Sequence, residues 1–165
     1  MRLTFERMAD RRTVETLVER DDGVVYAMRG AGGGADLPHD LVHAVVETEL
    51  RIADGVWGCV ADGVVWESMR HVSGRRPPHA EERSNRLKRE RTAAVQRAEA
   101  VADLVHRLAE GAEVLPSQLS TAGVPADALT AAALALRDTG RRWSALDPGT
   151  TWTLEWRPPP RGRRR

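Results

Sequence analysis

Two histidines and two acidic residues in one short stretch are the residues of this sequence best suited to chemistry. His39 and His43 are four residues apart. Asp40 lies between them, and Glu47 follows one turn after His43. On an α-helix at about 100° per residue, these four side chains fall within one sector roughly 100° wide. Two imidazoles so placed can bind one divalent ion, and nearby carboxylates can complete its coordination or move a proton.

The helix that would carry these residues is predicted over 37–52. Asp36 is a candidate N-cap, and Pro38 fits the first turn, where the missing N–H of proline costs little. The opposite side of the helix is apolar and consists of Leu41, Val42, Val45 and Val46. We therefore expect an amphipathic helix with one face in the core and the other face bearing the histidines.

A metal site on this helix needs a third ligand. Glu67 and His71 lie four apart in a later segment. If that segment packs face to face with the helix, either residue would complete a site with His39 and His43, and zinc is the expected ion. Glu47 would be a further ligand or a partner that fixes one imidazole.

The predicted function is that of a divalent-metal-binding protein, or of a metal-dependent hydrolase in which Asp40 orients the metal-bound water as a base. A histidine beside a carboxylate can also act as a general base without a metal. A purely structural role stays open, because every amphipathic helix has a polar face and Asp40 in a first turn complements the helix dipole.

The stretch LPHDLVH…VE, with GVWG and ADG after it, resembles a group of small bacterial proteins of no established activity. They carry an HD-x-x-H-x-x-x-E helix followed by a Gly-aromatic-Gly segment. The resemblance covers residues 1–72 and the final Trp-x-Leu-x-Trp strand, and it implies no mechanism. The two histidines are also similar to the HExxH helix of zinc peptidases, although Asp40 is one methylene shorter than the glutamate there. HD-type phosphohydrolases need a histidine upstream of such a dyad, and none precedes His39.

Composition indicates one globular domain. The chain has 165 residues, 41% hydrophobic and 30% charged, with a formal net charge of +1. This near-neutral balance gives no support for general attraction to nucleic acid or to a membrane surface. Cys59 is the only cysteine, so no intramolecular disulfide can form, and we expect a cytoplasmic protein of bacterial type. The glycine-rich stretch 30–35 lacks the residues of a phosphate-binding loop and is predicted to be a linker.

The alternating patterns predict an α+β fold. Residues 2–8, 13–20 and 24–29 are expected to form an antiparallel meander, with a hairpin turn at Asp21-Asp22-Gly23. A C-terminal strand over 150–156 is expected to join that sheet. The His-bearing helix and a long helical hairpin over 79–142 would pack with it.

The long helix predicted over 79–110 carries a heptad-like seam. The seam consists of Leu87, Ala94, Ala98, Val101, Val105 and Leu108, and Arg91 interrupts it. We expect the seam to pack on a second helix over 125–142 within the chain. The alternative is a non-catalytic interaction domain that uses this helix to bind a partner or a second copy. The domain is expected to span 1–157, with sheet and histidine helix in 1–72, and residues 158–165 are predicted to form a disordered basic tail.

Overall fold

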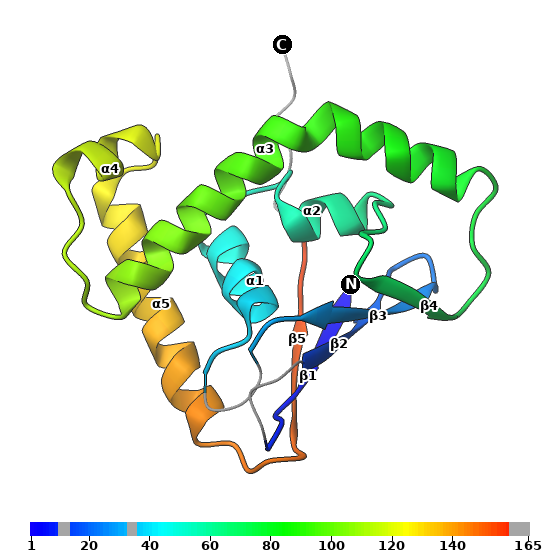
Figure 1. Cartoon of the computed structure of the whole chain (residues 1–165), viewed down its shortest axis with the longest axis horizontal. Helices are drawn as coiled ribbons and strands as arrows, with labels where there is room; N and C mark the ends of the chain where they lie inside the picture. The colour runs from blue at the N-terminus through cyan, green and yellow to red at the C-terminus, as the bar shows by residue number, and fades with distance from the viewer. Residues whose placement is uncertain (10–13, 33–35, 159–165) are drawn as a thin grey trace.

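The computed structural model describes residues 1–9, 14–32 and 36–158 and has the predicted α+β class (Figure 1). Its strands are β1 (Arg2–Glu6), β2 (Val14–Glu19), β3 (Val25–Gly30), β4 (Met69–Ser73) and β5 (Thr151–Glu155). Its helices are α1 (His39–Glu49), α2 (Val56–Ala61), α3 (Ala80–Ala109), α4 (Pro116–Thr121) and α5 (Ala126–Ser144). Parts of the expected linker and tail, residues 33–35 and 159–165, lie outside the described residues.

The five strands form one antiparallel sheet in the order β4-β3-β2-β1-β5. The N-terminal meander and the returning C-terminal strand are confirmed, and β5 pairs with β1. The sequence did not predict β4. The segment expected to pack face to face with the histidine helix turns instead and pairs with β3, whose backbone groups would otherwise have no strand partner on that side.

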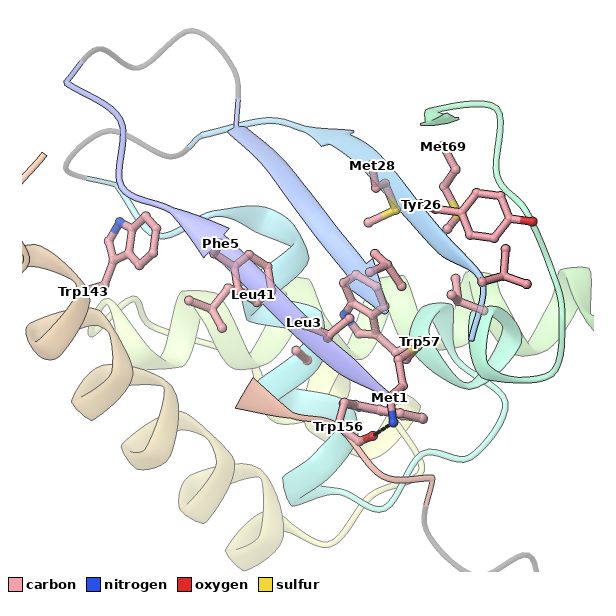
Figure 2. Packing of buried hydrophobic residues seen from close by; sticks show 14 residues of the cluster. Met1, Leu3, Phe5, Tyr26, Met28, Leu41, Trp57, Met69, Trp143 and Trp156 are labelled. Carbon is pink, nitrogen blue, oxygen red and sulfur yellow. Dashed lines mark hydrogen bonds between the residues drawn. The ribbon is translucent and has the colours of Figure 1, made fainter. Parts of the chain in front are cut away.

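One face of the sheet packs on the helices and the other faces solvent. The alternation in β1 sends Leu3 and Phe5 into the core, where both are fully buried. Figure 2 shows Leu3 beside Trp57 and Phe5 beside Leu41, and all four belong to one core cluster. The outer face is polar, with Arg2 paired to Glu155 across the strands. The sheet is therefore half-buried, as alternating strands require.

Helix α1 lies between the sheet and the outer helices α3 and α5 (Figure 1). Leu41 belongs to the core cluster on the sheet, whereas Val42 and Val46 belong to the cluster formed with α3 and α5. Both sides of α1 are thus covered, where the sequence predicted a single buried face. The helix begins at His39 and not at the expected N-cap Asp36, because Pro38 takes an extended ψ of 135°.

Helices α3 and α5 pack against each other, as the predicted hairpin requires. The seam of α3 is buried within the chain, with Ala98, Val101 and Val105 each at most 2% exposed. Arg91, which interrupts the seam, pairs with Asp62 next to α2. The seam is therefore used inside the molecule. None of the described helices combines the length and apolar character needed to cross a membrane.

Candidate metal centre

Helices α1 and α3 bring two imidazoles and one carboxylate together. One donor atom from each of His39, His43 and Glu99 lies within 4.8 Å of the others. Glu99 Oε2 is 3.1 Å from His43 Nε2 and 3.9 Å from His39 Nε2. Ligands about 2 Å from a tetrahedral ion are themselves about 3.3 Å apart. The three donors therefore need only small side-chain movements to share one ion.

The two histidines differ in exposure. The His43 side chain is 2% exposed, whereas those of His39 and Glu99 are 54% and 47% exposed. The group therefore has one buried side chain beneath α3 and two side chains at the surface, so an ion or a water molecule could reach it from solvent.

Glu99 was not among the residues selected from the sequence. It lies on α3, far from the histidines along the chain, and only the packing of α3 over α1 brings it to them. A signal for it existed nonetheless. Glu99, Asp103 and His106 follow at i, i+4 and i+7, which places a polar stripe along one side of α3 next to its apolar seam.

Glu47 lies behind His43 and is 1% exposed. Its Oε1 is 3.5 Å from His43 Nδ1, an ion-pair contact outside hydrogen-bond geometry. Its Oε2 accepts backbone N–H bonds from Trp57 at 3.1 Å and Gly58 at 3.3 Å, in the first turn of α2. Glu47 therefore acts as the N-terminal cap that α2 lacks in its own sequence.

Gly55 allows Glu47 to reach this position. A Cβ at residue 55 would lie 2.6 Å from the Cδ of Glu47, closer than side chains approach. The glycine directly before α2 is therefore a packing requirement of the buried carboxylate.

Electrostatics keep the two histidines in different protonation states. Burial alone would lower the pKa of His43, but Glu47 and Glu99 on either side of its ring outweigh burial and raise the pKa to about 9. Burial and the neighbouring His43 lower the pKa of His39. The contact with His43 lowers the pKa of Glu99. At neutral pH the metal-free group thus consists of a neutral His39, a protonated His43 and an ionised Glu99.

Asp40 points toward the sheet. Its Oδ2 accepts a hydrogen bond from Thr16 Oγ1 at 3.5 Å, and the carboxylate lies so close to Gly30 that a Cβ at residue 30 would clash with it. Burial raises the pKa of Asp40 to about 6. The expected water-orienting base therefore has a partner on β2 and is not a member of the three-residue group.

Glu67 and His71 also lie outside this group. Glu67 is exposed on the turn before β4. His71 is on β4, where its Nε2 bonds the carbonyl of Gly74 at 2.9 Å and its ring packs edge-on against Tyr26. The structure thus joins two of the predicted ligands, His39 and His43, and supplies the carboxylate from α3.

No family model, curated protein or solved structure matches the chain. The fold alone assigns no activity, so the function has to be inferred from the site.

Proposed function

We propose that the protein binds a divalent metal ion, with zinc as the best fit, through His39 Nε2, His43 Nε2 and a carboxylate oxygen of Glu99. The observation that carries the proposal is that one donor atom of each of the three residues lies within 4.8 Å of the others, with Glu99 Oε2 3.1 Å from His43 Nε2 and 3.9 Å from His39 Nε2. Two imidazoles and one carboxylate are a ligand set used by zinc enzymes.

Glu47 adds independent support. The Nδ1 atom of His43 is buried, has no hydrogen-bond partner among the described residues, and faces the Glu47 carboxylate. Metal-binding histidines commonly direct their second nitrogen to a carboxylate, which fixes the tautomer and the ring orientation. His43 therefore has the surroundings of a ligand as well as the position of one.

Three protein ligands leave a fourth position open, and a bound zinc ion lowers the pKa of a water there into the neutral range. We therefore extend the proposal to metal-dependent hydrolysis. A recess of about 370 Å³ lies between α3 and α4, and Asp103 lines it. Asp103 follows Glu99 by one helical turn on α3, and its charge raises the pKa of His39 slightly against the lowering by burial and by His43. A cytoplasmic location stays a prediction from the single cysteine.

Metal content of protein purified without a histidine tag tests the binding proposal. We expect one zinc, manganese or iron ion per chain in the wild type and none in the His39→Ala, His43→Ala double variant. Glu99→Gln should weaken binding at least tenfold. His71→Ala is the matched control, since it removes a histidine outside the group and should leave the stoichiometry unchanged. A wild type that takes up no ion, or whose Tm is unaffected by added zinc, contradicts the proposal.

Hydrolysis is tested on the metal-loaded protein with nitrophenyl esters and nitrophenyl phosphoesters. Activity should require the ion, disappear with a chelator and be absent in the double variant. Stoichiometric metal without turnover of either substrate class would remove the hydrolase extension and leave the binding proposal intact.

A further inference from the structure

The outer edge of β5 is an open sheet edge. Among the described residues, β5 has β1 as its one strand neighbour. Trp156 donates its N–H to the carbonyl of Met1 at 2.9 Å, and Arg7 donates to the carbonyl of Thr150 at 2.8 Å. The direction of hydrogen bonding alternates along an antiparallel strand. The even-numbered residues of β5 therefore bond to β1.

Thr151, Thr153 and Glu155 consequently direct their N–H and C=O groups away from the sheet. These residues are exposed, and the strand between them contains no proline, no lysine and no bulge. Such residues and irregularities are the usual means of preventing an edge from pairing with another strand. The opposite edge strand, β4, is irregular, because its pairing with β3 shifts register between Val25 and Tyr26 of β3.

An apolar recess lies beside this edge. Trp152 and Leu154 point to the helical side of the sheet and are only partly buried. A recess of about 200 Å³ is lined by these two side chains and by residues of α1 and α5, among them Leu41, Ala44, Val45 and Ala135. An added strand would thus gain backbone hydrogen bonds along the edge and cover apolar surface on one side.

We propose that the occupant of this edge is the β5 strand of a second copy of the chain, related by a two-fold axis at Thr153. The two strands would run antiparallel and extend the sheet across the dimer. This register pairs Thr153 with the partner's Thr153 and Thr151 with the partner's Glu155. Every outward-facing residue then meets an outward-facing residue, so the backbone groups of the whole strand are satisfied.

The side chains are compatible with the same register. On the helical side, Trp152 lies opposite the partner's Leu154 in a non-hydrogen-bonded pair, where side chains approach most closely. On the solvent side, each Glu155 carboxylate faces a threonine and remains next to Arg2 of its own chain, 3.0 Å away. No like charges are placed opposite each other. Two-fold axes centred on residue 152 or residue 154 would leave one end of the strand unpaired.

Sedimentation of the full chain between low-micromolar and submillimolar concentration tests the proposal. The dimer fraction should rise with concentration in the wild type. Thr153→Pro removes an outward N–H that β1 does not use and should give a monomer throughout. Thr153→Val is the matched control, because both variants lose the hydroxyl contact with Thr4 at 3.1 Å and only the proline loses the N–H. A monomeric wild type, or a Thr153→Val variant as monomeric as Thr153→Pro, overturns the proposal.

Amide hydrogen exchange of the wild type gives an answer that does not depend on a variant folding. Thr151, Thr153 and Glu155 amides should become protected as concentration rises, whereas Trp152 and Leu154 amides should be protected at every concentration. A concentration-dependent dimer in which the three outward amides exchange freely would place the interface elsewhere and contradict the proposal.

Discussion

The imidazole of His43 lies between two carboxylates that have different surroundings. Glu99 Oε2 is 3.1 Å from its Nε2 and half exposed, while Glu47 is buried and held by backbone N–H groups. His43 Nε2, which faces Glu99, would have to lose its proton to bind a metal ion. The Glu47 carboxylate at Nδ1 is held in place by the backbone of α2. His43 therefore belongs both to the buried contacts that hold α2 and to the proposed metal site.

The raised pKa of His43 predicts a pH dependence of stability in the metal-free protein. Its folded pKa of about 9 exceeds the ordinary histidine pKa of 6.5, so the protonated ring stabilises the fold fully below pH 6.5 and loses that effect as pH rises to 9. Denaturant unfolding with a chelator should show the wild type losing on the order of 3 kcal/mol relative to His43→Gln between about pH 6 and about pH 10. His71→Gln is the control and should follow the wild type. Parallel pH profiles of wild type and His43→Gln would contradict the ion-pair assignment.

Asp40 should have the opposite effect on stability. Burial raises its pKa from 3.8 to about 6, so the folded state keeps the proton longer than the unfolded chain, and stability falls as pH rises through this window. Asp40→Asn retains an acceptor for Thr16 and avoids the buried charge. Thermal or chemical unfolding should find the variant more stable than wild type by up to about 3 kcal/mol near pH 8, with no gain near pH 4. A gain of equal size at both pH values would show that charge burial is not the cause.

At the scale of elements, α1 and α2 are joined through a side chain. Helix α2 begins after Gly55 without a capping side chain of its own, and Glu47 of α1 provides the acceptor from outside. Trp57 of α2 in turn donates its ring N–H to the carbonyl of Asp40 at 2.9 Å. These contacts tie the short α2 to the helix that carries both histidines.

Glu47→Gln should therefore destabilise the protein and also weaken metal binding at the proposed site. Hydrogen bonds to a charged acceptor contribute about 1.5–3 kcal/mol, and denaturant unfolding should detect a loss of that order. Zinc affinity, measured by competition with a chromophoric chelator, should fall about tenfold or more, because the partner of His43 Nδ1 loses its charge. Glu49→Gln, an exposed position on the same helix, is the control for both measurements. Unchanged affinity in a folded Glu47→Gln variant would refute the coupling.

At the scale of the whole molecule, α5 contributes to both main cores. Leu136 lies in the cluster shared with α1 and α3, and Trp143 lies in the cluster on the sheet. Because α3 carries Glu99 and rests on α5, the position of that carboxylate depends on packing far from the site.

Leu136→Ala should show how much this shared core contributes to stability. Leu136 is 1% exposed, and its truncation should lower the free energy of unfolding by about 2–5 kcal/mol. Leu134→Ala, on the same helix but 59% exposed, should change stability by less than about 0.5 kcal/mol. Denaturant titration of the two variants measures the contrast. Similar losses in both variants would contradict the assignment of Leu136 to the shared core.

Much of the fold could be predicted from the sequence. Alternation identified the three N-terminal strands and β5, and helical spacing identified α1, α3 and α5, because both patterns record which side of an element is apolar. The one missed strand, β4, has a single buried residue, Met69, so its pattern carried almost no periodic signal.

The sequence by itself determined that His39 and His43 share one side of a helix, since their spacing fixes this wherever the helix packs. Only the tertiary structure decided what meets them. Packing of α3 over α1 brought in Glu99, α2 fixed Glu47 behind His43, and pairing with β3 removed His71 to the sheet edge. Local spacing specifies the faces of one element, whereas ligands from separate elements depend on long-range packing, which no single stretch of sequence contains.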